Sequence, residues 1–318
     1  MQIGKVMTDK SLQVWKLIDQ FDIKNQKPDS EFFSHAQIPT PLILSENSVR
    51  VFFATRNTDQ HSKIYSIDLS YNKLEKTFRW HEFSKKPVLS TGLAGTFDEH
   101  GVYPSSVVKI GQIYYMFYIG WNQGNHSSLF YSSIGIAKSE DGLAFTKMYP
   151  GPILARNQYE PILVTAPFVE IDSEVLKMHF VSGIEWIYSN GKLESRYDIK
   201  SIESSSIDNW SSKKRKSEIP LRDGETNIAR PWIFKDGNKK YMYFSFLQKN
   251  EIGYRVGMAF EDTKGTWHRL DNQLQFIGLH DDHTMAYPAV IKLMQRKFMF
   301  LNGDEYGKSG FYIFELDY

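Results

Sequence analysis

One motif occurs five times along the chain: a proline, an alternating apolar strand, a turn and a second, aromatic strand. Successive copies are 65, 63, 64 and 57 residues apart and begin at Pro39, Pro104, Pro167, Pro231 and Pro288. Third and fourth strands follow in most copies, divided by turn residues such as the Ser-Glu-Asp-Gly of residues 139–142. A repeat of about 60 residues is long enough for a four-stranded antiparallel sheet, so the chain is expected to form five such sheets.

The last copy stops after its third strand, and its missing fourth strand has a candidate near the other end of the chain. The stretch SLQVWKLIDQ at residues 11–20 resembles the outer strands of other copies, with a tryptophan in register. If residues 12–17 pair with residues 311–316, the array closes into a ring. Five four-stranded sheets closed in this way form a five-bladed β-propeller, which protects its strand edges by radial repetition.

We therefore predict an all-β fold in which residues 1–318 form a single five-bladed propeller domain. The N-terminal strand, at about residues 10–20, is expected in the last blade. Aromatic residues make up 15% of the chain and favour β-sheet, because they fit a pleated, half-buried surface. The alternative is a β-sandwich in which the proline spacing is accidental.

The composition narrows the classes of partner. The net charge is +1 with both signs mixed along the chain, which argues against nucleic acid or an anionic membrane as the main partner. The absence of cysteine excludes disulfides, thiolate metal sites and cysteine nucleophiles. The N-terminal residues lack the apolar core of a signal peptide and no apolar run reaches transmembrane length, so a cytoplasmic location is expected.

Polar side chains gather just before the motif prolines. The first strand of a propeller blade is innermost, so these residues and those that end the antiparallel second strand should meet at one mouth of the central channel. The residues before the prolines include four carboxylates, three histidines, an amide and an arginine: Asp98, Glu160, Glu225, Asp282, His35, His100, His283, Gln37 and Arg230. The residues at the second-strand ends include Arg56, Trp121, Asn122 and Trp186. Any one of them could instead be a turn cap or a solvent contact.

Carboxylates that face one funnel suit glycoside chemistry. A protonated carboxyl donates to the leaving oxygen, and an ionised one acts as nucleophile or activates water. Arg56 and Arg230 could hold a charged sugar substituent, a phosphate or an ionised partner. Trp121 and Trp186 could stack on sugar faces or simply pack between blades. No Gly-rich phosphate loop, nucleophile elbow or dinucleotide fingerprint is present, so no cofactor is expected.

A metal site is the competing interpretation of the histidines. His35, His100 and His283 could gather around one ion together with Asp98 or Asp282. No close His-x-His or His-Glu-x-x-His spacing supports such a site, so the prediction is that no metal is bound.

These stretches resemble the five-bladed propeller glycoside hydrolases: arabinanases and xylosidases, invertases and levansucrases, and mannoside phosphorylases. The resemblance covers nearly the whole chain and rests on YYMFYIGW (114–121), KYMYFSF (240–246) and IGIAKSEDGLAFTK (134–147). SHAQIPTPLIL (34–44) and GVYPSSVVKIG (101–111) look like an uncharacterised bacterial branch described only as glycosidase-like.

The resemblance implies roles for three carboxylates. Asp98 matches the aspartate that stabilises the transition state, and Glu160 matches the general acid. The first blade departs from the family, because His35 and Gln37 stand where an aspartate nucleophile or base is expected, and Asp282 is the substitute. The resemblance thus implies a glycoside hydrolase that binds carbohydrate through its other funnel residues.

Two further functions use the same funnel: a non-catalytic glycan-binding propeller, and a glycoside phosphorylase or transferase. The spacing of the carboxylates separates hydrolysis from binding. A pair about 5–9.5 Å apart across an open pocket favours hydrolysis. Carboxylates that are all held by arginines favour binding or a structural role.

Overall fold

The computed structural model describes residues 12–81, 83, 86–124, 130–172, 175–189, 192–212, 214–279 and 284–317. These residues are mostly β-strand. The helical elements among them are short: η1 (Ile23–Gln26), η2 (Asp271–Gln273) and α1 (Asp304–Gly307). None of the described helices is long and apolar enough to cross a membrane.

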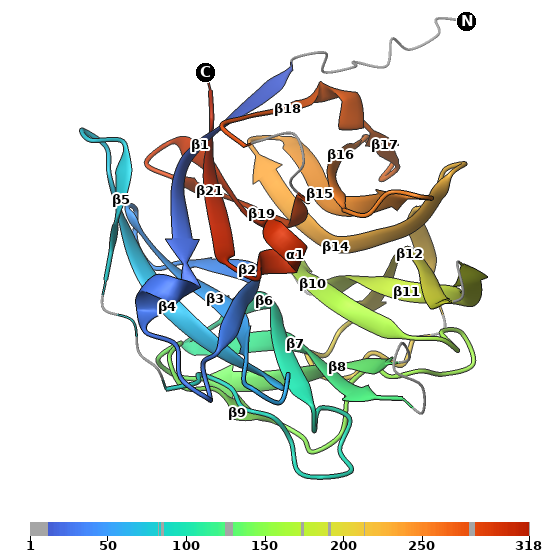
Figure 1. Cartoon of the computed structure of the whole chain (residues 1–318). Coiled ribbons are helices and arrows are strands. Elements are labelled where there is room, and N and C mark those ends of the chain that lie inside the picture. Colours follow the sequence, from blue (N-terminus) through green and yellow to red (C-terminus); the bar gives the residue numbers. More distant parts are fainter. Residues whose placement is uncertain are drawn as a thin grey trace, which may run out of the picture.

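Two of the three hydrogen-bonded sheets have eight strands, and each divides into two antiparallel groups (Figure 1). The first sheet contains β2 (Ser34–Ile43), β3 (Ser48–Arg56), β4 (Ser62–Asn72), β5 (Thr77–Trp80), β6 (Gly101–Ile110), β7 (Ile113–Gln123), β8 (Phe130–Ser139) and β9 (Thr146–Lys147). Its halves are joined at β4 and β6 by one parallel residue pair, Ser62 with Gly101.

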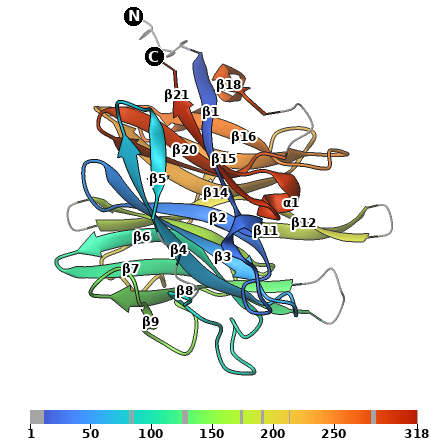
Figure 2. The same cartoon turned by 60° about the vertical axis from the view of Figure 1, so that its left-hand side comes forward.

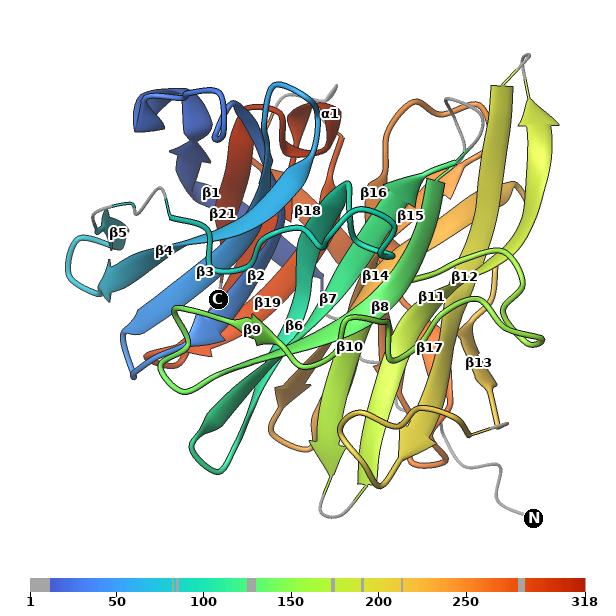
Figure 3. The same ribbon diagram turned by 90° about the horizontal axis from the view of Figure 1, so that it is seen from below.

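The second eight-stranded sheet is built in the same way. It contains β10 (Val164–Asp172), β11 (Val175–Ser189), β12 (Lys192–Ser204), β13 (Lys216–Ile219), β14 (Glu225–Asp236), β15 (Lys239–Gln248), β16 (Arg255–Glu261) and β17 (Trp267–Arg269). One parallel pair, Tyr197 with Asn227, joins its halves at β12 and β14. The 15-residue β11 and the 13-residue β12 are the longest strands described, and their hairpin projects beyond its neighbours (Figure 3).

The third sheet joins the two ends of the described chain. Its order is β18 (Leu274–Ile277), β1 (Gln13–Asp22), β21 (Gly310–Leu316), β20 (Arg296–Asn302) and β19 (Ala286–Leu293). The predicted pairing of the N-terminal strand with the final strand is confirmed, because β1 runs antiparallel to β21 with Trp15 opposite Leu316 (Figure 2). Phe21 lies opposite Phe311, and their stacked rings are 5.0 Å apart.

Strand β18 was not expected in this sheet. It pairs in parallel with the free edge of β1, with Trp15 opposite Phe276. The sequence motif places residues 274–277 in the tail of an outer hairpin, and nothing in the local pattern indicates that they reach across to another edge. The added strand covers an edge of β1 that would otherwise present unpaired backbone groups.

The first strands of the groups gather in the middle of the molecule (Figure 1). Each of the five motif prolines lies inside one of these strands, in the order β2, β6, β10, β14 and β19. Strand β2 contacts β6, β6 contacts β10, β10 contacts β14, β14 contacts β19, and β19 contacts β2 again. Residues from all parts of the chain therefore meet around one central region.

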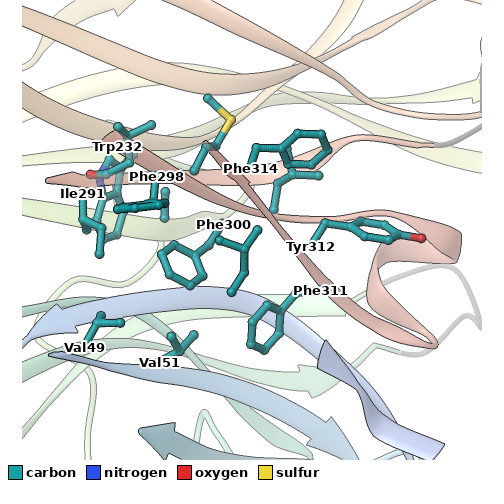
Figure 4. Close-up of a cluster of buried hydrophobic side chains, with 14 of the residues drawn as sticks. Val49, Val51, Trp232, Ile291, Phe298, Phe300, Phe311, Tyr312 and Phe314 are labelled. Carbon is teal, nitrogen blue, oxygen red and sulfur yellow. The ribbon is translucent and has the colours of Figure 1, made fainter. Parts of the chain in front are cut away.

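A large apolar cluster joins the two ends of this circle. Val49 and Val51 of β3 face Phe300 of β20 and Phe311 of β21 across a shared core (Figure 4). All four side chains are fully buried. Burying large apolar side chains is the main favourable term in folding, so this cluster holds the first and last groups together.

Candidate functional site

Five residues that directly precede the motif prolines line one cavity of about 550 Å³. They are Ile38, Tyr103, Ala166, Arg230 and Tyr287, one from each first strand. We refer to these five residues as the pocket floor and to the cavity as the central pocket.

The repeated prolines explain why these side chains turn into the cavity. A proline has no N–H for the strand ladder, so it favours a β-bulge, and a bulge re-aims the neighbouring side chain. The antiparallel register shifts at or across all five prolines. Four of the five preceding residues also have positive φ: Ile38 (57°), Ala166 (49°), Arg230 (53°) and Tyr287 (61°). Backbone strain of this kind concentrates at functional sites.

Aromatic side chains make up much of the wall. Trp121 of β7 and Phe130 of β8 line the pocket on one side, and Tyr197 and Tyr306 line it elsewhere. The Trp121 indole donates to Ser62 Oγ at 3.1 Å, which fixes the orientation of the ring. Flat apolar rings with polar rims are the side chains that stack on sugar faces.

Three tyrosines of the pocket lining, Tyr197, Tyr287 and Tyr306, cluster with Tyr254, which does not itself line the pocket. The hydroxyls of Tyr197 and Tyr254 share a hydrogen bond, and the rings of Tyr254 and Tyr306 are 5.8 Å apart. Burial raises the pKa of Tyr197 to about 12 and raises those of Tyr254, Tyr287 and Tyr306. These phenols therefore stay protonated near neutral pH and present neutral hydroxyl groups.

Polar groups also line the pocket. Arg56 Nε, at the end of β3, donates to Gln37 Oε1 at 3.0 Å. The His100 ring lies 5.0 Å from His61 and 5.9 Å from Trp121. Gln37, Arg56, His100, Trp121 and Arg230 are the predicted site residues that the structure brings to the pocket.

Arg230 differs from the other predicted site residues in the pocket, because it is almost fully buried and two of its nitrogens lack hydrogen-bond partners among the described residues. Its side chain is about 1% exposed, and its Nη2 donates to Thr40 Oγ1 at 3.1 Å and to two backbone carbonyls at 3.4 Å. Its Nε and Nη1 have no hydrogen-bond partner, and no described carboxylate forms an ion pair with it. Burial lowers the pKa of Arg230 to about 9.

Three predicted catalytic or binding carboxylates do not reach the pocket; each is buried in an ion pair. Asp98 lies 2.5 Å from Lys147 Nζ, and both oxygens of Glu160 accept from Arg215 Nε at 3.1 and 3.2 Å. Glu225 accepts from two Arg269 nitrogens at 2.8 and 2.7 Å. The expectation that these carboxylates face one funnel is corrected by this geometry.

These carboxylates do not reach the pocket because each one links the inner strand of its antiparallel group to the outermost strand. In three antiparallel groups, the carboxylate at or before the first strand pairs with a base on or near the short outermost strand, β9, β13 or β17. We call these three pairs the ion-pair clips: Asp98–Lys147, Glu160–Arg215 and Glu225–Arg269. Their carboxylates recur at a common distance from the prolines because each clip joins the inner and outer edges of its group.

The other predicted site residues either do not line the central pocket or are not among the residues that the structure describes. His35 is buried and bonds Ser34 Oγ at 2.8 Å. Trp186 does not line the pocket, but it packs on Phe130, 5.9 Å away, and against the apolar cluster that contains Ile38 and Ala166. Asn122 does not line the pocket either. Asp282 and His283 fall outside the described residues, so their roles stay predictions. No three described His, Asp or Glu side chains are grouped closely enough to hold a metal ion.

Sequence reasoning missed several pocket residues. Asp59, Gln60 and His61, from the turn between β3 and β4, line the pocket, and Asp59 is the one carboxylate among its described lining residues. Tyr103, Ala166 and Tyr287 were also missed. Their signal was present, because each stands immediately before a motif proline.

Comparison with solved structures relates this fold to carbohydrate-active enzymes. A glycosyl hydrolase from Bacteroides ovatus matches with a TM-score of 0.66 and 12% identity over 96% of this chain and 95% of that one. A thermostable family-43 glycoside hydrolase matches with a TM-score of 0.59 and 15% identity over 90% of each chain. The endo-arabinase from Bacteroides thetaiotaomicron VPI-5482 matches with a TM-score of 0.60 and 14% identity over 89% and 94%. At these identities the matches establish a shared fold.

Comparison by sequence adds a relative of unassigned activity. Uncharacterized protein Rv1502 of Mycobacterium tuberculosis is 26% identical over 282 residues, which cover 87% of this chain and 91% of that protein. No family model matches the chain.

Proposed function

We propose that this chain is a single five-bladed β-propeller that binds a carbohydrate in its central pocket. The five antiparallel groups, the circle of contacts among their first strands and the fold shared with glycoside hydrolases support the blade count. A cytoplasmic location and the absence of a cofactor remain predictions from the sequence.

The observation that carries the proposal is the lining of the pocket. Trp121 and Phe130 offer apolar faces, while Gln37, Arg56 and His100 offer donors and acceptors. Sugar rings need both kinds of contact, because their C–H faces are apolar and their hydroxyls are polar. Small-molecule pockets are typically largely apolar with a few directed polar groups.

Binding is favoured over hydrolysis by Asp98 and Glu160. A general acid must come within hydrogen-bond reach of the leaving oxygen, and hydrolysis uses two carboxyl groups across the bond. Glu160 is fully buried against Arg215, and Asp98 is about 1% exposed against Lys147. Neither side chain lines the pocket in which a saccharide would lie.

A catalytic function in the same pocket is the second candidate. Asp59 favours it, because a carboxylate on the pocket wall could act as a general base or orient a nucleophile. Hydrolysis, phosphorolysis and transfer all require a second group, and Asp282 stays the predicted one. Loss of turnover in Asp59→Asn, with saccharide binding retained, would favour this candidate over binding alone.

Titration of the protein with a panel of saccharides tests the proposal. Wild type is expected to bind at least one of them, and Trp121→Ala should weaken that binding about tenfold, since an aromatic face contributes roughly 0.5–1.5 kcal/mol beyond buried area. Trp186→Ala is the matched control, with a smaller effect because Trp186 does not line the pocket. Failure to bind any saccharide, or unchanged binding by Trp121→Ala, would contradict the proposal.

A further inference from the structure

We propose that the ligand of the central pocket is anionic: a carbohydrate that carries a carboxylate or phosphate group, drawn to the floor by Arg230. This inference rests on the proposed function and adds the chemical class of the ligand. The observation behind it is that the Arg230 guanidinium has no ion-pair partner among the described residues, whereas the other largely buried arginines have one.

The charge of Arg230 is not neutralised within the described part of the protein. Arg50 and Arg269, also largely buried, each form an ion pair with a carboxylate, at 2.7 Å in both cases. Around Arg230 the acceptors are neutral: one hydroxyl and two carbonyls, all at Nη2. The guanidinium carbon also lies 5.3 Å from the centre of the Trp232 ring.

An unpaired buried charge is unfavourable for folding. Moving an isolated ion out of water costs several kcal/mol, and each unsatisfied buried donor adds to the cost. Nε and Nη1 of Arg230 are both unsatisfied, and its φ of 53° adds backbone strain. Groups that are costly to the fold are retained where they act, and this one lies at the floor of the central pocket.

The rest of the pocket is compatible with a negative ligand. Arg56 adds a second guanidinium to the lining, whereas Asp59 adds the one described carboxylate. His61 and His100 lie beside each other and can donate to an anion when protonated. Tyr197, Tyr287 and Tyr306 line the pocket as neutral phenols, so they do not repel an anion. An anion at the pocket floor would be attracted by the positive charge of Arg230 in a low-dielectric environment, where charge interactions are stronger than in water.

The test compares matched acidic and neutral sugars. The full chain is titrated at low salt with glucuronate against glucose, galacturonate against galactose, and glucose 6-phosphate against glucose, with inorganic phosphate alone as a separate arm. We expect the acidic member of at least one pair to bind about tenfold or more tighter, with the preference reduced by salt. The inorganic phosphate arm separates a free anion from an anionic group attached to a sugar.

Arg230→Gln supplies the decisive variant. It should reduce the acid-to-neutral affinity ratio to near one, with the affinity of the same variant for the neutral sugar as the reference for that ratio. Its melting temperature should not fall, because the change removes an unpaired buried charge. Arg255→Gln is the matched control: this exposed arginine pairs with Glu251 outside the pocket, and its loss should keep the full preference.

The outcomes separate this inference from the proposed function. Equal binding of acidic and neutral sugars by wild type, or a preference that survives in Arg230→Gln, overturns the inference and keeps carbohydrate binding. Binding of inorganic phosphate without any sugar supports the anion site and overturns the carbohydrate assignment. Absence of binding in every arm overturns both.

Discussion

The pocket floor and the ion-pair clips recur at nearly the same period, yet their polar groups are satisfied in different ways. In two clips the carboxylate accepts hydrogen bonds from an arginine, as Glu225 does from Arg269 at 2.7 Å, and in the third Asp98 forms an ion pair with Lys147 at 2.5 Å. On the floor, Arg230 keeps two donors without partners, and Ile38 and Tyr287 hold positive φ. The clips thus have the properties of structural supports, whereas the floor has the properties of a binding site.

This difference shows that repetition of a residue type alone does not identify functional residues in a repeat fold. Each antiparallel group needs its inner strand held to its outer strand, so a residue type can recur because the architecture recurs. A better indication of function is a recurring position whose members are strained or unsatisfied. By that criterion the residues directly before the prolines are informative, and the carboxylates six or seven residues before the prolines are not.

The largest expected effect comes from breaking a clip. Glu225→Gln keeps the shape of the side chain but leaves Arg269 without its bidentate partner in a site where both side chains are at most 5% exposed. Asp271 still holds Arg269 at 2.7 Å, so the unfolding free energy in urea should fall by about 1.5–3 kcal/mol, the contribution of hydrogen bonds to a charged group, rather than by the larger cost of an unpaired buried charge. Saccharide affinity of the folded variant should be unchanged.

A surface pair provides the control for that experiment. Glu185→Gln breaks the contact with Arg196, in which the two side chains are 47% and 33% exposed. Exposed pairs contribute roughly 0–1 kcal/mol, so stability should change little. A Glu225→Gln protein as stable as wild type, or one that folds normally but loses saccharide binding, would contradict the structural role assigned to the ion-pair clips.

The next effect is a dependence of stability on pH that arises from His35. Burial, together with Arg56 and Lys308, lowers the pKa of this histidine from 6.5 to about 4. The unfolded chain therefore takes up a proton as pH falls below about 6.5, while the folded chain does not until about pH 4. This contribution to stability is present above about pH 6.5 and decreases as pH falls toward 4.

Urea unfolding at several pH values checks this assignment. His35→Asn should show a shallower loss of unfolding free energy between pH 6.5 and 4 than wild type, and a change at exposed His81 should keep the wild-type slope. Equal slopes for wild type and His35→Asn would mean that His35 is not held neutral beside the pocket.

The smallest expected effect concerns backbone strain on the floor. Ala166 has a φ of 49°, a region that costs a non-glycine residue about 1–2 kcal/mol. Ala166→Gly should therefore leave stability unchanged or raise it by up to about 1 kcal/mol. Ala137→Gly, at a fully buried position of β8, should instead lower it by roughly 0.5–1 kcal/mol or more. Equal losses from both changes would argue against a strained floor.

Much of the fold could be predicted from the sequence because its signals are local. Alternating apolar residues after each proline identify the first strands, and the pairing of Trp15 with Leu316 followed from a strand that the last group lacked. The parallel pairing of β18 with β1 could not be predicted, because it depends on which edge remains free once the sheets assemble.

The site was predictable only in part, for a physical reason. Counting residues back from a proline gives sequence distance but not side-chain direction, which a β-bulge changes. It also gives no indication of partners, and Arg269 and Arg215 lie 44 and 55 residues beyond Glu225 and Glu160. Trp121 was found because it ends a strand whose direction is set by regular alternation.

A crystal structure with a bound saccharide would locate the ligand site. Ligand density is expected in the central pocket, against Trp121 and above Arg230 and Tyr287, with the Asp98–Lys147 and Glu160–Arg215 pairs intact. Density between Asp98 and Glu160, with Lys147 and Arg215 displaced from their carboxylates, would contradict this expectation.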